Sequence, residues 1–321
     1  MRIYSGALRI IAALAVILLA GQAVGQQAVP ARPRITGISH VGYFVSDLPK
    51  ALEFWHGLLG FDEYYSLARE NGKNVRIAFI KINDRQHVEL FTDPPPSPPS
   101  HMSHVCFSVD DVDAMRRYLA ANGITVPAKV TKTHAGDLAF EVHDPDGTLV
   151  EFAQMLPDGM ESKAAGKFLP ESRISSRIYH VGFLVGNSER AMEFYGKLLG
   201  FQETWRGTAN PAQLSWINMR VPDGTDYVEF MLYDKVPTDY GGKNHTSLVV
   251  PDVNKAVSTL QARPAFQSYG RPVKVATGVN QKRQVNLFDP DGTRVELMEE
   301  NTITGKPTPS STAPPPPPAH P

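Results

Sequence analysis

The chain has 321 residues, of which 42% are hydrophobic, so it is long enough and apolar enough for two domains with cores of their own. Its 32 basic and 33 acidic side chains give a net charge of -1, which argues against nucleic acid as a partner and favours a small-molecule ligand. The single cysteine, Cys106, excludes an intramolecular disulfide and a cysteine-based zinc cluster. Any bound metal would therefore need histidine and carboxylate ligands.

The two ends of the chain differ in composition from the rest. Arg2 and Arg9 mark a basic start, residues 10–20 form an apolar run, and small residues follow. This pattern predicts a secretory signal peptide over residues 1–25 and a secreted or periplasmic protein with no stable membrane span after cleavage; an uncleaved membrane anchor is the alternative. At the other end, the proline-rich residues 301–321 are predicted to be a disordered tail.

Between these ends the sequence repeats itself. ISHVGYFVSDLPKALEFWHGLLGF (38–61) aligns without a gap with IYHVGFLVGNSERAMEFYGKLLGF (178–201), which indicates duplication of a whole domain. Within each half, HVCFSVDDVDAMRRYLAANGI (104–124) and HTSLVVPDVNKAVSTLQARPA (245–265) begin in the same way. We therefore predict four related modules, divided into a first domain over 36–155, a linker over 156–176 and a second domain over 177–300.

The first module shows the expected elements in order. HVGYFV is rich in β-branched and aromatic residues and predicts a strand. Asp47 is a candidate N-cap for a helix whose apolar residues recur at three- and four-residue steps until Gly60. Three strands complete a βαβββ unit. In the second and fourth modules an Asp-Pro-Asp-Gly turn leads into the last strand, as DPDGTLVEF (144–152) and DPDGTRVEL (289–297).

Each module carries a histidine in its first predicted strand and a glutamate in its last. The pairs are His40 with Glu89, His104 with Glu151, His180 with Glu229, and His245 with Glu296. Because side chains alternate along a strand, each glutamate is expected to point away from its apolar neighbours. A carboxylate inside a curved sheet needs a cation or several donors to offset its desolvation. The four pairs therefore indicate metal binding.

These motifs resemble the vicinal oxygen chelate superfamily, which includes glyoxalase I, extradiol dioxygenases and the bleomycin resistance proteins. The resemblance covers residues 36–300 and lies in HVG, LLGF, DPDG and the paired His and Glu residues. It implies an α+β fold in which four βαβββ modules pair into two curved-sheet cups, the glyoxalase/bleomycin resistance/dihydroxybiphenyl dioxygenase fold. In that family, first-strand histidines and last-strand glutamates hold one divalent metal ion on the floor of a cup.

Two pairings of the modules are open. Pairing of consecutive modules gives the ligand sets His40, Glu89, His104, Glu151 and His180, Glu229, His245, Glu296. Pairing of the outer modules would instead bring His40 and Glu89 to His245 and Glu296. The stiff, proline-rich link over 92–100 favours consecutive pairing. Two imidazoles with two carboxylates suit Zn, Ni, Co, Mn or Fe(II).

The number of ligands bears on the chemistry. Four side-chain ligands on an octahedral ion leave two positions for adjacent substrate oxygens, which favours a glyoxalase-like isomerase or lyase. The resemblance implies that Glu151 and Glu296 are the catalytic bases. An extradiol ring-cleaving dioxygenase and a non-catalytic, resistance-type binding protein are the alternatives. His134 lies in the region of the extradiol histidine, but Glu141 and Asn286 occupy the positions of the extradiol tyrosine.

The substrate is expected to differ from that of glyoxalase I. Phe44 and Leu184 stand where that enzyme has the arginine that grips glutathione. We predict that Phe44, Phe107, Leu184 and Trp216 line a pocket for a different small molecule. His87 shares a strand face with Glu89, but Tyr227 replaces it in the third module, so we expect it near the site and not among the ligands. The chain is expected to be a monomer or a homodimer.

Overall fold

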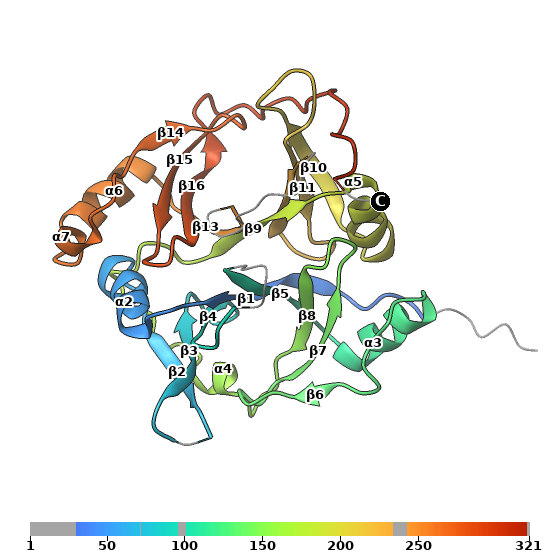
Figure 1. The fold of residues 1–321 in the computed structure, drawn as a ribbon, viewed down its shortest axis with the longest axis horizontal. Coiled ribbons are helices and arrows are strands. Elements are labelled where there is room, and N and C mark those ends of the chain that lie inside the picture. The colour runs from blue at the N-terminus through green and yellow to red at the C-terminus, as the bar shows by residue number, and fades with distance from the viewer. Residues whose placement is uncertain (1–29, 71, 96–100, 234–242, 320–321) are drawn as a thin grey trace, which may run out of the picture. The chain divides into compact units, whose positions relative to one another are not determined.

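The computed structural model describes residues 30–319 except residues 71, 96–100 and 234–242. Within these residues the strands form two eight-stranded sheets, one for each half of the chain (Figure 1). None of the described helices is long and apolar enough to cross a membrane. The predicted signal peptide, residues 1–25, lies outside the described residues.

The strands follow the predicted modules. Those of the first sheet are β1 (Ile35–Phe44), β2 (Glu63–Ala68), β3 (Val75–Lys81), β4 (His87–Phe91), β5 (Met102–Val109), β6 (Thr131–Lys132), β7 (Leu138–His143) and β8 (Leu149–Gln154). Those of the second sheet are β9 (Ile178–Val185), β10 (Gln202–Gly207), β11 (Trp216–Arg220), β12 (Tyr227–Leu232), β13 (His245–Val249), β14 (Val275–Thr277), β15 (Lys282–Phe288) and β16 (Arg294–Thr302).

The order of the strands shows which modules pair. The first sheet runs β2-β3-β4-β1-β5-β8-β7-β6, and the second runs β10-β11-β12-β9-β13-β16-β15-β14. Each sheet therefore joins two consecutive modules through an antiparallel contact between their first strands, β1 with β5 and β9 with β13. The prediction of an α+β fold with four βαβββ modules in two curved sheets is confirmed, and the modules pair consecutively.

The helix of the first module begins directly after Asp47, the N-cap that the sequence predicts. The described helices are α2 (Leu48–Leu52) with its π-helical continuation η1 (Glu53–Leu58), α3 (Val112–Ala121), α4 (Met160–Lys163), α5 (Ser188–Ala191) with the π-helical η2 (Met192–Leu198), α6 (Val253–Gln261) and α7 (Phe266–Tyr269). Asp47, Asp111, Asn187 and Asp252 each accept a backbone N–H bond at the start of a module helix. The same capping device therefore recurs in all four modules.

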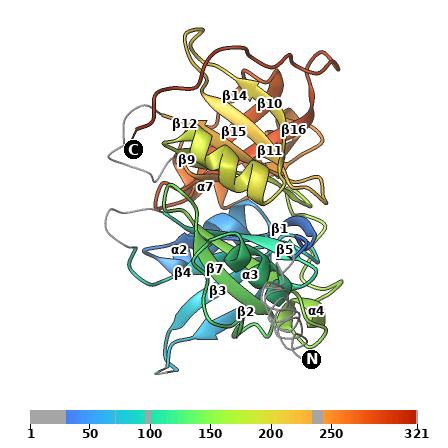
Figure 2. The ribbon, with the colours of Figure 1, turned by 90° about the vertical axis from the view of Figure 1, so that its right-hand side faces the viewer.

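The helices of one half pack against helices and strands of the other. The ring of Phe54 on η1 lies 6.2 Å from that of Tyr269 on α7. The Tyr118 hydroxyl on α3 donates to the backbone carbonyl of Leu198 on η2 at 2.7 Å, and both helices can be followed in Figure 2. A continuous core of buried residues includes strands of both sheets. Packing on one side of each sheet leaves its other side free for the cup.

Two segments differ from the sequence prediction. The segment predicted as a linker over 156–176 contains α4, and its backbone is held to the first sheet by the Met160 N–H, which donates to the Ala135 carbonyl at 2.7 Å. In place of the disordered tail expected over 301–321, the described tail residues lie along the second half of the chain. Ser311 N–H donates to the Arg206 carbonyl at 2.9 Å, which gives this proline-rich segment a fixed backbone partner.

Candidate metal centre

The four central strands of the first sheet bring four predicted ligands together. His40 lies on β1, Glu89 on β4, His104 on β5 and Glu151 on β8. His40 Nε2 lies 2.9 Å from His104 Nε2 and 3.3 Å from Glu151 Oε2. His104 Nε2 lies 3.2 Å from Glu151 Oε2, and Glu89 Oε2 lies 3.9 Å and 3.6 Å from the two imidazole nitrogens. Ligand atoms about 2.1 Å from one ion are about 3.0–3.4 Å apart. The distances among His40, His104 and Glu151 are close to this range, and those to Glu89 are longer. We call these four residues the first cup.

Glycine makes room for this arrangement. Gly42 pairs with both Glu89 and His104 across the sheet, and a Cβ atom on it would lie 2.6 Å from the His104 ring. Gly182 in the second sheet is crowded in the same way by the His245 ring. The glycine of the HVG motif therefore clears the space that the imidazole of the facing strand occupies.

The histidines of the first cup have polar neighbours on the side away from the carboxylates. Ser39 Oγ lies 3.3 Å from His40 Nδ1, and Ser103 Oγ lies 3.2 Å from His104 Nδ1. When Nδ1–H donates to the serine oxygen, Nε2 carries the lone pair that faces the cup. This is the tautomer that a metal ligand requires.

The charges in the first cup are complementary. Burial alone would raise the pKa of Glu151, but hydrogen bonds from His104 and His40 outweigh it and hold this pKa well below its ordinary value. Burial would lower the pKa of His104, but Glu151 and then Glu89 raise it. The first cup thus stabilises ionised carboxylates. Two carboxylates match the charge of a divalent ion, which would displace protons from the imidazoles.

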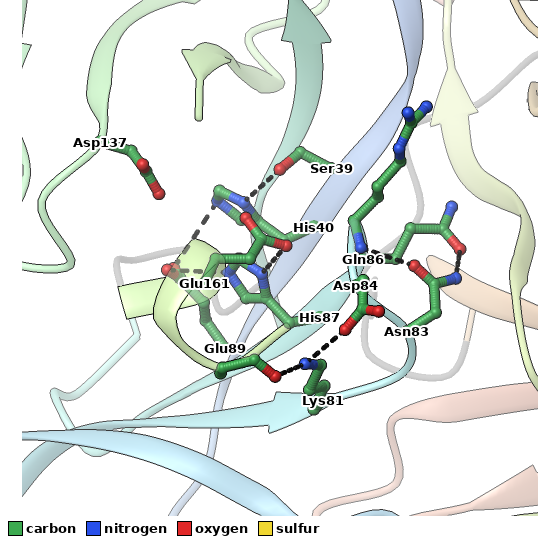
Figure 3. A network of polar contacts seen from close by, with 12 residues as sticks. Ser39, His40, Lys81, Asn83, Asp84, Gln86, His87, Glu89, Asp137 and Glu161 are labelled. Atoms are coloured by element: carbon green, nitrogen blue, oxygen red, sulfur yellow. Dashed lines mark hydrogen bonds and ion pairs between the residues drawn. The ribbon is translucent and has the colours of Figure 1, made fainter. Parts of the chain in front are cut away.

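A further histidine and an acid from α4 extend the first cup (Figure 3). His87 on β4 stacks on His40 with ring centroids 4.5 Å apart. Its Nε2 lies 3.6 Å from Glu89 Oε1, and its Nδ1 lies 3.6 Å from Glu161 Oε1. Burial would lower the pKa of His87, but Glu161 and Glu89 raise it to about 10. His87 therefore orients Glu89 and His40 from behind. Glu161 was missed because it lies outside the repeat.

A cavity of about 240 Å³ lies over the first cup. Its acidic lining residues are Glu89, Asp137, Glu141, Glu151 and Glu161, and its larger apolar ones are Leu67, Ile77, Phe79, Phe91 and Met155. Among the described residues, no lysine or arginine lines it. The cavity is therefore small, partly apolar and without a fixed cation for an anionic substrate group.

The second sheet repeats the four ligand positions. His180 lies on β9, Glu229 on β12, His245 on β13 and Glu296 on β16. His180 Nε2 lies 3.1 Å from His245 Nε2 and 3.4 Å from Glu296 Oε2, and Glu229 Oε1 lies 3.8 Å from His245 Nε2. A cavity of about 260 Å³ is lined by the two glutamates. These four residues are the second cup.

Electrostatics distinguish the second cup from the first. Arg294 lines the cavity of the second cup, and its Nη2 lies 3.0 Å from His245 Nε2. Burial and then the charge of Arg294 hold the pKa values of His180 and His245 well below the ordinary histidine value. Burial and then the charge of Glu296 raise the pKa of Glu229 to about 8. The second cup therefore favours neutral side chains where the first favours ions.

Neither of the two residues predicted to line the pocket of the first cup is among its lining residues. Phe107 is fully buried on the face of β5 opposite His104, and its ring lies 6.1 Å from that of Phe152. It does not line the cavity as predicted, because residues three apart on a strand point to opposite faces. Phe44 shares the face of His40 but is not a lining residue; its ring lies 6.0 Å from Phe91, which is one.

Of the two residues predicted to line the pocket of the second cup, one lines the cavity and the other does not. Trp216 lines the cavity of about 260 Å³, together with Trp205 from the neighbouring strand. Leu184 lies on the same strand as His180 and is buried, but it is not among the residues that line this cavity. The backbone N–H of Leu184 donates to Asn244 Oδ1 at 3.0 Å.

Two residues considered for the dioxygenase alternative lie in the first cavity. His134 and Glu141 both line it, and Glu141 pairs with Glu151 on the neighbouring strand. Burial and then the charge of Glu151 raise the pKa of Glu141. In the second sheet Asn286 pairs with Glu296 in the same manner. The residues that replace tyrosine therefore lie directly beside the last-strand glutamates.

Comparison of sequences gives two ranges of family similarity and two enzyme relatives. The family model for the Glyoxalase/Bleomycin resistance protein/Dioxygenase superfamily matches residues 37–152 and again 177–297. The chain is 22% identical over 222 residues to glyoxalase I of Saccharomyces cerevisiae, which covers 62% of this chain and 64% of the yeast protein, less than two thirds of its length. It is 23% identical over 308 residues to lactoylglutathione lyase of Schizosaccharomyces pombe, covering 82% of this chain and 96% of that protein.

Comparison of structures shows the same fold. A variant of homoprotocatechuate 2,3-dioxygenase from Brevibacterium fuscum superposes with a TM-score of 0.63 at 17% identity, over 87% of this chain and 75% of that one. The Mn(II)-bound glyoxalase from Novosphingobium aromaticivorans superposes with a TM-score of 0.61 at 20% identity, over 84% and 83%. With the family model matched in both halves, the chain belongs to the Glyoxalase/Bleomycin resistance protein/Dioxygenase superfamily, in a tandem form of four modules.

Proposed function

We propose that the first cup is the centre of a metal-dependent, glyoxalase-like lyase or isomerase. The observation that carries the proposal is the convergence of His40 Nε2, His104 Nε2 and Glu151 Oε2 within 3.3 Å, with Glu89 Oε2 3.6–3.9 Å from both nitrogens. The donor set fits Zn, Ni, Co, Mn or Fe(II), with His40, Glu89, His104 and Glu151 as the ligands. The similarity to two glyoxalase-type enzymes supports the same class of reaction.

The residues of the first cup have different roles in the proposed reaction. A bound divalent ion would supply a Lewis acid for two adjacent substrate oxygens. Glu151 accepts the proton from the carbon beside the substrate carbonyl and returns it to the neighbouring carbon. His87 orients Glu89 and His40, because it contacts the carboxylate of Glu89 and stacks on the ring of His40, and Glu161 contacts His87 in turn.

The lining of the cavity limits the substrate. Five acidic residues and no described lysine or arginine line it, so an anionic group such as a glutathione carboxylate gains no ion pair there. Phe44 stands at the position of the family's glutathione-binding arginine and is placed against Phe91. A volume of about 240 Å³ also lies below the range of about 300–1,000 Å³ typical of drug-sized ligands. The substrate we propose is small, uncharged and able to chelate through adjacent oxygens.

Turnover of a matched pair of substrates tests this proposal. The metal-loaded protein is assayed with the hemithioacetals of methylglyoxal formed with 2-mercaptoethanol and with glutathione. We expect faster turnover of the uncharged adduct and its loss after chelation of the metal. Faster turnover of the glutathione adduct would contradict the proposed substrate class, and no turnover of either would contradict the proposed reaction.

One observation keeps a ring-cleaving dioxygenase as the second candidate. His134 lines the first cavity, in the region where the extradiol enzymes place a histidine, and a dioxygenase shares the fold. Uptake of oxygen by the Fe(II)-loaded protein on addition of a catechol would favour this candidate. The absence of uptake, together with hemithioacetal turnover, would favour the isomerase or lyase.

The cellular location is a separate proposal. The basic and apolar composition of residues 1–25 supports export with removal of this segment. N-terminal sequencing of the protein from a cell fraction outside the cytoplasm tests it. A mature chain that still begins at Met1 in the membrane fraction would instead support the uncleaved anchor.

A further inference from the structure

The last strands of the two cups differ at one position that faces the ligands. Leu149 precedes Glu151 by two residues on β8, and Arg294 precedes Glu296 by two residues on β16. Residues two apart on a strand share a face, so both Leu149 and Arg294 are directed to the side of the sheet that carries the ligands. The duplicated DPDG motif thus places an apolar side chain beside one cup and a guanidinium beside the other.

The guanidinium of Arg294 contacts the histidine of the second cup. Arg294 pairs with His245 across the parallel strands β16 and β13. Its Nη2 lies 3.0 Å from His245 Nε2, and it also contacts His245 Nδ1. The nearest sulfur, Met231 Sδ, lies 3.5 Å from the same Nη2. The cation therefore contacts both ring nitrogens, Nδ1 more closely than Nε2, and lies 3.0 Å from the nitrogen that faces His180.

The guanidinium of Arg294 lies beside the His245 nitrogen that a metal ion would need as a ligand. His245 Nδ1 lies 3.0 Å from the backbone carbonyl of Lys243, which accepts only if Nδ1 carries the proton. His245 Nε2 is then the acceptor, with a single lone pair toward the cup. A guanidinium 3.0 Å from this nitrogen keeps a permanent positive charge beside the position that a metal ion would take, and arginine cannot become neutral to admit one.

The first cup lacks this obstacle. His104 Nδ1 has Ser103 Oγ as its neighbour, and its Nε2 faces His40 and Glu151. No lysine or arginine is among the described lining residues of its cavity. The two cups therefore carry the same ligand types, and only in the second does a fixed cation lie among the donor atoms.

We infer that the second cup holds no metal ion and that Arg294 supplies its positive charge, so the protein binds one divalent ion per chain, in the first cup. The residues of the second cup do not fit a dication as they stand, although they repeat the ligand set. The exclusion of metal from the second cup is independent of the reaction proposed for the first, whereas the ion in the first cup rests on that proposed function.

The number of bound ions tests the inference. The purified protein is saturated with Zn²⁺, passed through a gel-filtration column and analysed for metal by mass spectrometry. We expect about one ion per chain for the native protein, about one for His180→Ala and none for His40→Ala. Arg294→Leu, which installs the residue of the first cup, should raise the count by one, and Arg294→Lys, which keeps the charge, should not.

Each outcome decides between the alternatives. A native count of two, or an ion that survives His40→Ala and is lost in His180→Ala, would overturn the inference. So would an Arg294→Leu protein, folded by circular dichroism, whose count equals that of the native protein. A native count of zero would overturn the metal dependence proposed for the first cup instead, and the Arg294→Leu count would still decide the case of the second.

Discussion

The first and second cups present the same two histidines and two glutamates from corresponding strands, but the residues around them differ. His87, backed by Glu161, stands beside the first cup, where the second has Tyr227. Leu149 stands two residues before Glu151 in the first cup, where the second has Arg294 two residues before Glu296. After a duplication, the strands and glycines that build a cup are retained because the fold depends on them. The charge within the cup is free to change, because a few flanking residues set it.

The difference in charge gives the cups opposite responses to pH. In the first cup the pKa of Glu151 is held below its unfolded value, so its stabilisation is present above that value and is lost as the pH falls. In the second cup the pKa of Glu229 is raised to about 8, so stability is lost as the pH rises toward that value. A fall in pH therefore lowers the folding stability contributed by Glu151, and a rise in pH lowers that contributed by Glu229.

Transfer of the arginine is the change expected to have the largest effect. Leu149→Arg places a guanidinium beside His104, as Arg294 lies beside His245. We expect loss of the bound metal ion and of all metal-dependent turnover, because the new cation competes for the same donor atoms. Isothermal titration with Zn²⁺ measures the loss. Leu149→Met, of similar size and without charge, is the control and should bind as the native protein does; equal binding by both variants would contradict the comparison.

Removal of the proposed base should affect the two cups unequally. Glu151→Gln keeps the size of the side chain but cannot accept a proton, so we expect kcat to fall about 100-fold or more at saturating metal. Glu296→Gln, the matched change in the second cup, should alter kcat less than about twofold. Steady-state kinetics with the uncharged hemithioacetal compares the variants. A larger loss in Glu296→Gln would assign the reaction to the second cup.

The sequence was sufficient for the fold and for the convergence of the ligands. The repeated motifs and the alternation of strands place His40 and Glu151 on one face of one sheet, as the structure has them. The same alternation directs Phe107, which lies three residues after His104, into the core. The prediction of Phe107 as a pocket residue is wrong for that reason.

Other parts of the site required the tertiary structure. Glu161 reaches His87 from α4, 74 positions along the chain, and no repeat or motif marks it. The exchange of Leu149 for Arg294 is visible in the two DPDG motifs, but the significance of the arginine depends on the parallel pairing that brings it to His245. The placement of the tail depends on contacts with residues far from it in the sequence, because Ser311 N–H donates to the Arg206 carbonyl and Thr308 Oγ1 donates to the Asn280 carbonyl.

Replacement of His87 sharpens the comparison further. His87→Tyr installs the residue of the second cup and removes the contacts with Glu89 and Glu161. Loss of a partner that orients a ligand typically weakens metal binding about 10- to 100-fold. We expect a loss of affinity of about 10-fold, because Glu89 keeps its contacts with His40 and His104. Competition with a metal indicator measures the affinity. Tyr227→His is the reciprocal control and should not create a metal site while Arg294 remains; a gain of metal would contradict this.

The smallest effect is expected on the stability of the metal-free protein. Because the folded-state pKa of Glu229 is about 8, folding favours its protonated form, and ionisation between about pH 4.5 and 8 is opposed by the fold. Glu229→Gln cannot ionise, so it should match the native stability near pH 4 but exceed it near pH 9. Chemical unfolding at both pH values, with chelator present, measures the difference. Glu151→Gln should instead be less stable than the native protein near neutral pH, since its carboxylate is stabilised when charged. Equal pH profiles for the two variants would show that the charge in the cups has not diverged.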